Sequence, residues 1–281
     1  MGPYAFAGGT AVVTGAASGI GEALAVQLAE RGSSLVLVDK DADRLATVAD
    51  GIRTAHPQLA VQTYVVDLAD EAATDELGAT LASAHPQTTL LVNNAGVALG
   101  GRFDQVTLEE FDWVLAINFR AVVRLTAALL PVLKAHPGAH LVNVSSVFGI
   151  FAPAGQAAYA ASKFAVRGFS ESLRHELADD GIGVTVVHPG GIRTRIAQSA
   201  RMGSGVPPEL AAGREEFDKL LRIPPEKAAA QIVAAIEKRR PRLLIGATAK
   251  VPDALVRLRP GTYWRPIARI AGRRAAAGGR G

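Results

Sequence analysis

The chain has 281 residues, 49% hydrophobic and 20% charged, so it is long enough for a buried core and too apolar to be disordered as a whole. It has no cysteine, which excludes disulfides, thiolate nucleophiles and cysteine-ligated metals and favours a reducing compartment. Its net charge of +4 is uneven: residues 238–281 hold 12 of the 30 lysines and arginines, and the mildly acidic remainder does not fit a nucleic-acid-binding domain.

Short runs of β-branched residues alternate with longer stretches of helical spacing. The runs lie at 10–14, 35–39, 61–67, 89–93, 140–145, 184–188 and 242–246, and the helical stretches at 19–31, 41–54, 70–84, 107–134, 157–180 and 226–239. Strands that are apolar throughout are typical of a parallel sheet covered on both faces. The pattern predicts a doubly wound α/β fold of Rossmann type with seven mostly parallel strands, and Pro131 predicts a kink within 107–134.

The first run leads directly into TGAASGIG, which places Gly15, Gly19 and Gly21 at the start of the first helical stretch. Small residues let the backbone approach a pyrophosphate there, and the N–H groups and dipole of the helix stabilise its charge. The spacing differs from the G-x-G-x-x-G fingerprint, so the motif for dinucleotide binding is only partly met. A tight turn without a ligand is the alternative.

Acidic and amide residues end the next strands. Asp39 ends the second one, where a carboxylate can accept hydrogen bonds from the adenosine ribose, and this favours NAD over NADP. Lys40 beside it would soften the repulsion of a 2′-phosphate. Asp67 ends the third strand and Asn93-Asn94 ends the fourth. Because the carboxyl ends of parallel strands open onto one crevice, these side chains are expected to meet there.

Tyr159 and Lys163 lie four residues apart in YAASK, on one face of a helical stretch. An unperturbed phenol, with a pKa of about 10, is a poor base at neutral pH. An ammonium one turn away favours the phenolate and lowers that pKa. The pair alone is a weak signal, because such a spacing also arises by chance in an alanine-rich helix.

Taken in order, these motifs resemble the short-chain dehydrogenase/reductase family over residues of about 8–246. The family's TGxxxGIG loop corresponds to 14–21, its NNAG to 93–96, its YxxxK to 159–163 and its PGxxxT to 189–194. Its helix asparagine corresponds to Asn118. Its serine precedes the tyrosine by 13 residues, which selects Ser146 over Ser145.

The resemblance implies a hydride transfer between a nicotinamide cofactor and a secondary alcohol or ketone. It implies that Tyr159 is the general acid and base, that Lys163 lowers its pKa and holds the nicotinamide ribose, and that Ser146 polarises the substrate oxygen. Asn118 would anchor a water in a proton relay. The implied cofactor-binding residues are Gly15, Ser18, Gly19, Ile20, Gly21, Asp39, Asp67, Leu68, Asn94, Ala95, Gly96, Tyr159, Lys163, Pro189, Gly190, Ile192 and Thr194.

Residues 190–225 form a long insert, which is predicted to be a substrate lid. A hydrophobic substrate such as a steroid, a lipid or an acyl derivative is expected, because apolar residues recur in this insert and after the candidate serine. They are Ile196, Met202, Val206, Leu210, Phe217, Leu220 and Leu221 in the insert, and Phe148, Ile150 and Phe151 after the serine.

Two other functions are open. One is a non-catalytic dinucleotide-binding protein that senses redox state or acts as a scaffold, and the other is a sugar-nucleotide epimerase or dehydratase of the related longer-chain group. The complete serine, tyrosine, lysine and asparagine set argues against the first, and the glycine spacing argues against the second. No metal is expected, because Pro137-Gly138 separates His136 from His140 and denies them a shared helix face.

We expect one catalytic domain over 1–246 and a basic extension over 247–281, whose last residues, AAAGGRG, should be disordered. Pro260-Gly261 would divide Lys250–Arg274 into two helical pieces of interleaved apolar and basic residues. Packing on the body and peripheral contact with an anionic membrane are both open for this extension. The N-terminus lacks the pattern of a signal peptide, and a cytoplasmic location is expected.

A homodimer or homotetramer is also expected. The stretches 107–134 and 157–180 carry apolar residues around more of their circumference than one sheet contact covers. These residues include Leu125, Leu129, Val132, Phe164, Phe169 and Leu173.

Overall fold

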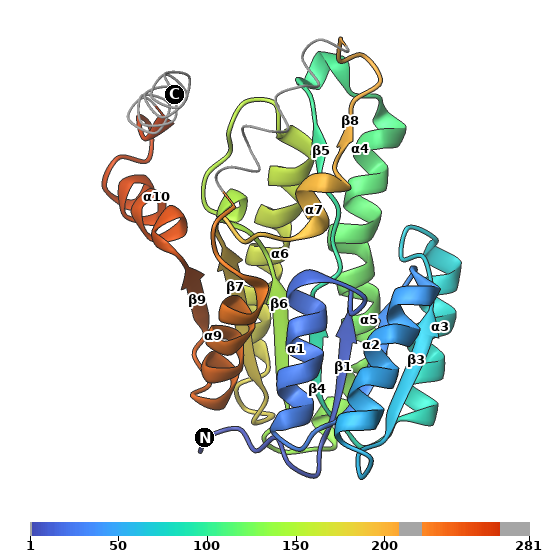
Figure 1. Ribbon diagram of the computed structural model, residues 1–281. Coiled ribbons are helices and arrows are strands. Elements are labelled where there is room, and N and C mark those ends of the chain that lie inside the picture. Colours follow the sequence, from blue (N-terminus) through green and yellow to red (C-terminus); the bar gives the residue numbers. More distant parts are fainter. Residues whose placement is uncertain (1, 208–220, 265–281) are drawn as a thin grey trace.

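The computed structural model describes residues 2–207 and 221–264, and its main feature is a seven-stranded sheet (Figure 1). The strands are β1 (Thr10–Thr14), β2 (Ser34–Asp39), β3 (Val61–Val65), β4 (Thr88–Asn93), β6 (His140–Val144), β7 (Gly183–Pro189) and β9 (Arg242–Ile245). Their order is β3-β2-β1-β4-β6-β7-β9, and every neighbouring pair is parallel. The predicted doubly wound fold is confirmed, and the chain order reverses between β1 and β4, where such folds bind ligands.

Helices cover both faces of this sheet. One core contains α1 (Gly19–Glu30), α2 (Ala42–Ala55) and α9 (Pro225–Glu237), and the other contains α3 (Glu71–Ala84), α5 (Ala121–Lys134) and α6 (Ala157–Glu176). The strands β1 and β6 are buried along their whole length, which explains why they do not alternate between apolar and polar residues. The polar residues of β6, His140 and Asn143, are buried with hydrogen-bond partners.

Side-chain caps fix the starts of several helices. Asp41 and Asp70 accept hydrogen bonds from Arg44 N and Ala73 N at the starts of α2 and α3, at 3.3 and 3.0 Å. Thr107 begins α4 (Leu108–Leu115) with a capping box. At α1, by contrast, the N-cap Ser18 makes no side-chain cap bond. The first turn of α1 therefore keeps its backbone N–H groups available to a ligand.

The stretch expected as one helix over 107–134 is α4, a π-helical turn η2 (Ala116–Arg120) and α5. The helix α5 continues through Pro131 to Lys134, and the kink expected at Pro131 stays a prediction; the break in α-helical hydrogen bonding lies at η2. Leu108–Lys134 is long and apolar enough to cross a membrane, yet half of its most apolar window is buried inside the structure. It is therefore consistent with a core helix.

The six apolar residues that suggested an oligomer are mostly covered by the chain itself. Leu125, Leu129 and Leu173 are buried in the core beneath α3, α5 and α6, and Phe169 packs against it. Phe164 is the exception, with 39% of its surface exposed. The argument from uncovered helix faces is thus wrong for most of these residues.

Short elements lie above the carboxyl ends of the strands (Figure 1). They are β5 (Leu99–Gly100), η1 (Phe103–Gln105), η3 (Val147–Gly149), α7 (Arg195–Gln198) and β8 (Arg201–Met202). β5 and β8 pair in parallel, so part of the predicted lid is tied to the segment that follows β4. Leu210, Phe217 and Leu220 of that lid lie outside the described residues.

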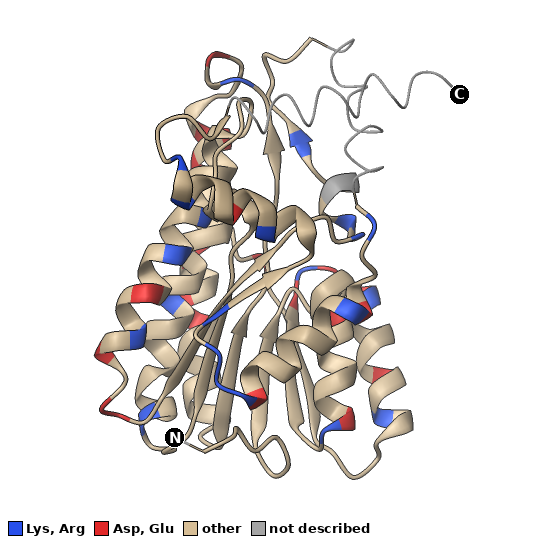
Figure 2. Cartoon of the chain, turned by 90° about the vertical axis from the view of Figure 1, so that its left-hand side faces the viewer, with Lys and Arg blue, Asp and Glu red and all other residues tan. Residues whose placement is uncertain are grey.

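The helix α10 (Ala247–Leu258) follows β9, and from residue 265 onward the second predicted helical piece of the extension lies outside the described residues. Asp253 of α10 is paired with Arg242 of β9 and with Arg257. Burial alone would raise the pKa of Asp253, but the two guanidiniums lower it below its usual value. Figure 2 shows the other charged residues mainly on the outer helices and loops.

Candidate active site

A cavity of about 760 Å³ opens at the carboxyl ends of the strands. It is lined by most of the residues that the sequence singled out for cofactor binding. These are Gly15, Ser18, Gly19, Ile20, Asp39, Asp67, Leu68, Asn94, Ala95, Gly96, Tyr159, Lys163, Pro189, Ile192 and Thr194. The cavity therefore joins the glycine loop to the YAASK helix.

The glycine loop is packed so closely that side chains would not fit. Gly15 has φ +67°, and a Cβ there would lie 2.8 Å from Ala95 Cα. Gly21 does not line the cavity. A Cβ added at Gly21 would lie 2.0 Å from the Gly15 carbonyl oxygen, so this glycine allows the loop to pack closely on itself. Thr14 Oγ1 accepts hydrogen bonds from the backbone N–H groups of Asn94 and Ala95, both at 3.0 Å. The loop is thus held against the end of β4.

Asp39 lies between the loop and the start of α2. Its carboxylate accepts hydrogen bonds from Ala17 N at 3.0 Å and from Asp41 N at 3.1 Å. Lys40 Nζ lies 3.8 Å from Asp67 Oδ2. A bare glycine cradle, an uncapped helix start and a carboxylate on one wall fit a dinucleotide, with the phosphates at α1 and a ribose at Asp39.

Ser146 and Ser145 follow β6 and point to different places, as alternation along a strand requires. Both serines line the cavity, and Ser146 Oγ accepts a hydrogen bond from Phe148 N at 3.1 Å. The hydroxyl of Ser145 donates a hydrogen bond to the carbonyl oxygen of Lys163 at 2.8 Å. Ser145 thereby fixes the α6 backbone behind the site.

Tyr159 and Lys163 are both deeply buried. Lys163 Nζ donates a hydrogen bond to Val144 O at 3.0 Å and lies 5.8 Å from the centroid of the Tyr159 ring. Burial lowers the pKa of Lys163 to about 8. Burial raises the pKa of Tyr159, although its hydrogen bond with Ser146 lowers it in part. This is opposite to the expected direction, because desolvation of the buried phenolate exceeds the lowering that Ser146 provides.

Asn118 lies behind the cavity wall, fully buried in the π-helical turn. Its Oδ1 accepts a hydrogen bond from Val97 N at 2.8 Å, and its Nδ2 donates to Val97 O and to Ser162 Oγ, both at 3.0 Å. A Cβ on Gly96 would lie 3.2 Å from Asn118 Oδ1 and 3.3 Å from Lys163 Nζ. Asn118 therefore fixes the NNAG segment and does not line the cavity.

Gly190 does not line the cavity either. A Cβ on it would lie 2.8 Å from Thr248 Oγ1, so Gly190 allows β7 to pack against the start of α10. His188, two residues earlier, is fully buried and its Nδ1 is hydrogen-bonded to the carbonyl oxygen of Ser146 at 3.0 Å. Burial lowers the pKa of His188 to about 4, so it is neutral at pH 7 and its Nδ1 donates the hydrogen bond.

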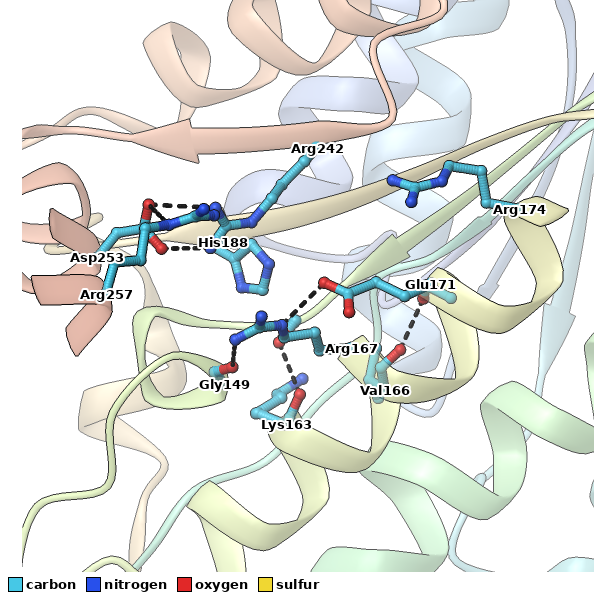
Figure 3. A network of polar contacts seen from close by, with 12 residues as sticks. Gly149, Lys163, Val166, Arg167, Glu171, Arg174, His188, Arg242, Asp253 and Arg257 are labelled. Atoms are coloured by element: carbon cyan, nitrogen blue, oxygen red, sulfur yellow. Dashed lines mark hydrogen bonds and ion pairs between the residues drawn. The ribbon is translucent and has the colours of Figure 1, made fainter. Parts of the chain in front are cut away.

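Figure 3 shows the charged groups that surround His188. Arg242, Asp253 and Arg257 lie together at the β9–α10 junction, and Arg167 of α6 pairs with Glu171 and donates to Gly149 O. Arg242 and Asp253 thus join β9 to α10, and Arg167 joins α6 to the η3 turn that follows the candidate serine.

The end of the cavity away from the glycine loop contains some of the apolar residues that the sequence predicted for a substrate pocket. Phe148 lines it, and its ring lies edge-on to the Tyr159 ring at 5.9 Å between centroids. Ile196, Met202 and Leu221 of the insert also line the wall. Ile150 and Phe151 do not, since both are buried in the interior, and Val206 packs beside Gly101 instead.

Several wall residues carry no signal in the sequence. They include Trp113, Ile117, Gln156, Arg195 and Arg201. Among the described residues, no group of three or more His, Asp or Glu side chains could hold a metal ion. His140 is buried with its Nε2 on Thr185 Oγ1, at 2.8 Å.

The parallel sheet, the glycine loop at α1 and the carboxylate that ends β2 define a dinucleotide-binding protein of Rossmann type. A family model described as short chain dehydrogenase matches residues 9–204. The chain belongs to this family, and it is an oxidoreductase with a nicotinamide cofactor.

SadH of Mycobacterium tuberculosis, an oxidoreductase by its name, is 39% identical over 270 residues, which cover 94% of this chain and 95% of SadH. A short-chain dehydrogenase/reductase from Burkholderia phymatum in complex with NAD has a TM-score of 0.80 and 31% identity, covering 91% of this chain and 94% of that one.

A short-chain dehydrogenase from Sphingobium yanoikuyae in complex with NADPH has a TM-score of 0.75 and 30% identity, and covers 90% of this chain and 94% of its own. The bulky-bulky ketone specific alcohol dehydrogenase from Comamonas testosteroni has a TM-score of 0.73 and 26% identity, and covers 90% and 92%. The structural neighbours thus include complexes with NAD and with NADPH.

Proposed function

We propose that this chain interconverts a hydrophobic secondary alcohol and its ketone with NAD, and that Tyr159 is the general acid and base. One observation carries the proposal: Ser146, Tyr159 and Lys163 line the same cavity as the glycine loop and Asp39. A nicotinamide cofactor bound there supplies or accepts the hydride. The remaining chemistry is proton movement and charge stabilisation by the chain.

In the direction of ketone reduction, Tyr159 donates its phenolic proton to the carbonyl oxygen as negative charge develops there. The pKa of Tyr159 is raised by burial, so the phenol is protonated at neutral pH and ready to donate. Ser146, whose oxygen accepts from Phe148 N, can turn its O–H from Tyr159 to the substrate oxygen and stabilise the charge that develops there. Lys163, with a pKa of about 8, holds a proton that can replace the one that Tyr159 loses.

The preference for NAD rests on Asp39. Its carboxylate faces the place of the adenosine ribose, and a 2′-phosphate would meet its charge at close range. Lys40 is the opposing influence, but its ammonium is 3.8 Å from the carboxylate of Asp67, which competes for it. We infer that Asp39 decides between the two cofactors.

The hydrophobic substrate is supported by the wall at the far end of the cavity, where Phe148, Ile117, Met202 and Leu221 lie. The alcohol dehydrogenase of Comamonas testosteroni, which is specific for bulky-bulky ketones, is one of the structural neighbours. A wide apolar space beside the candidate tyrosine suits a ketone with large substituents on both sides.

The test is a panel of aromatic, alicyclic and long-chain ketones with their alcohols, assayed with NAD(H) and NADP(H) at the nicotinamide absorbance band. Turnover of apolar ketones with a preference for NADH is the expected result. Activity confined to polyols, or absent with both cofactors, would contradict the proposal.

We further propose one catalytic domain over 1–246, a cytoplasmic location and a homodimer or homotetramer. Of the six apolar residues that suggested an oligomer, Phe164 on α6 is the one that remains exposed, with 39% of its surface accessible to a second subunit. Light scattering at micromolar concentration tests the oligomer, and a monomer would contradict it.

Peripheral contact of the extension with an anionic membrane is proposed on α10. Its Val251 and Leu258 are 52% and 80% exposed beside Lys250 and Arg257, while Asp253 is turned inward in its ion pairs. Sedimentation with anionic and neutral vesicles tests this, and the expected result is salt-sensitive binding to the anionic ones. The chain to compare is one cut after Gly261, which keeps α10 and the pair of Arg242 with Asp253. A cut after Gly246 would remove Asp253 and leave Arg242 without its partner.

A further inference from the structure

The far end of the cavity contains an arginine stacked on a tryptophan. The Cζ atom of Arg201 lies 3.9 Å from the centroid of the Trp113 ring, and both residues line the cavity wall. At this distance the guanidinium lies over the aromatic face, and this attraction restricts the directions in which the exposed arginine side chain can point.

Both partners are held in place by structure around them. Arg201 belongs to β8, where it is paired with Leu99 of β5, and its backbone N–H donates to Ala98 O at 3.0 Å. Trp113 belongs to α4 and packs against the small cluster of Leu99, Val114 and Ala158. The guanidinium is therefore positioned by a strand on one side and by a helix on the other.

The guanidinium has no hydrogen-bond acceptor and no ion pair among the described residues. Arg124, Arg167 and Arg242, by comparison, each donate to a carboxylate. Stacking occupies the face of a guanidinium and leaves its N–H edge free, which is the edge that binds a carboxylate with two parallel hydrogen bonds.

The carboxylates of the cavity wall, Asp39 and Asp67, lie at the ends of β2 and β3, and Lys40 lies 3.8 Å from Asp67. Lys163 lies beside Tyr159, where its Nζ is hydrogen-bonded to Val144 O. Arg201 is the cation that β8 contributes to the wall, together with the apolar side chain of Met202. An uncharged apolar substrate would leave Arg201 without an ionic partner among the described residues.

We propose that Arg201, positioned by Trp113, binds a carboxylate at the end of the substrate remote from its reacting carbon. The substrate is then an apolar ketone or secondary alcohol that also carries a carboxylate, such as an oxo or hydroxy acid with a long or alicyclic body. This inference rests on the proposed function for its reacting carbon, whereas the anion site itself can be tested without turnover.

The binding test uses decanoate and decanamide as probes of equal length. Trp264→Phe leaves Trp113 as the single tryptophan of the chain, so its fluorescence reports binding at this wall. Decanoate should bind about 10- to 100-fold more tightly than decanamide, as expected for a charge-assisted pair. Arg201→Gln should abolish the difference, and Arg201→Lys should keep only part of it, because an ammonium lacks the planar fork.

Arg102→Gln is the matched control, because Arg102 is an exposed arginine of the neighbouring loop that pairs with Asp104 and does not line the cavity. It should leave the preference for decanoate unchanged. Equal affinities for the two probes before substitution, or an equal loss in both variants, would overturn the proposal.

The turnover test uses straight-chain oxo acids with the ketone at successive positions, each compared with its methyl ester. The acids should have the higher kcat/KM, and Arg201→Gln should bring the ratio of kcat/KM for acid over ester close to one. If esters and acids are reduced equally well, the anion site is wrong and the proposed reaction stands. If decanoate binds as expected but nothing is turned over with either cofactor, the proposed reaction fails instead.

Discussion

The two ends of the cavity are built in different ways. The cofactor end consists of strand ends locked together by buried contacts, such as those of Thr14 with Asn94 and Ala95. The substrate end consists of two-residue strands, a short helix and exposed side chains such as Arg201. The difference teaches that the sheet determines where a cofactor can bind, while the added segments determine what it reacts with.

The largest expected effect lies where the two ends meet. Tyr159→Phe should lower kcat by about 100- to 10,000-fold, because it removes the proton donor while the ring still packs against Phe148. The dissociation constant of NADH should be nearly unchanged, as measured by its fluorescence. Tyr64→Phe, which removes a hydroxyl bound to His85 far from the site, is the control and should keep activity. Retention of most activity in Tyr159→Phe would remove the tyrosine from the mechanism.

The tightness of the cofactor end is tested by Gly21→Ala. The new methyl group would lie 2.0 Å from the Gly15 carbonyl oxygen, so the loop must shift. Overpacking of this kind costs about 1–3 kcal/mol in unfolding free energy, and NAD should bind more weakly. Gly51→Ala is the matched control, since nothing lies within 4 Å of its site in α2, and it should stabilise the chain by about 0.5–1 kcal/mol. Unchanged NAD affinity in Gly21→Ala would mean that the loop is not packed as tightly as described.

A smaller effect should appear in the choice of cofactor. Asp39→Ala should reduce the ratio of kcat/KM for NAD over NADP by about tenfold, since it removes a ribose acceptor and a repulsive charge. Asp43→Ala, which makes the same charge change on the exposed first turn of α2, should leave the ratio as it is. A ratio that is maintained or rises in Asp39→Ala would place the selectivity elsewhere.

The smallest expected effect is on the pH dependence of stability, through His188, which is hydrogen-bonded to the carbonyl oxygen of Ser146. Burial lowers the pKa of His188 from its usual 6.5 to about 4, so below pH 6.5 the unfolded chain binds a proton that the folded chain excludes. Stability that is complete above pH 6.5 is therefore lost as the pH falls toward 4, by up to about 1.4 kcal/mol per pH unit for this group.

His188→Asn should make that slope shallower while it keeps a donor for the Ser146 carbonyl. Urea unfolding at several pH values measures the slope. The slope should not vanish, because buried His140 has its pKa lowered to about 3 and contributes in the same direction. His175→Asn on the exposed side of α6 is the control, and an identical slope in His188→Asn and the parent chain would contradict the assignment.

Much of the cofactor end could be predicted because its strands and helices leave a repeated pattern of apolar residues in the sequence. Apolar runs locate the strands to within two residues of their observed ends, and parallel strands bring Asp39, Asp67 and Asn94 to one edge whatever the loops do. The choice of Ser146 over Ser145 followed from spacing, and both serines line the cavity, but the Ser145 hydroxyl donates its hydrogen bond to the carbonyl oxygen of Lys163. Gly21 and Gly190 instead serve close packing, which a motif cannot distinguish from ligand contact.

The substrate end could not be predicted in this way. Trp113 and Arg201 meet only because β5 and β8 pair over two residues, too short a pairing to leave a pattern. Ile150 and Phe151 look like pocket residues in the sequence, but the η3 turn directs them into the interior. The direction of the Tyr159 pKa was wrong because spacing shows the neighbouring ammonium but not the depth of burial.

The π-helical turn at Ala116–Arg120 limits how this chain can change in length. An α-helix advances about 100° per residue, so loss of one residue from α4 or α5 would rotate everything after it by that angle. Leu125, Leu129 and Leu133, now in the core, would be turned away from it. The π-helical turn already holds one residue more than an α-turn, so loss of one residue there would close it to an α-turn and leave α5 in place, at the cost of the position that Asn118 has opposite Val97. Related chains should therefore differ in length at the exposed loops around α4 or by one residue at this turn, and not within α4 or α5.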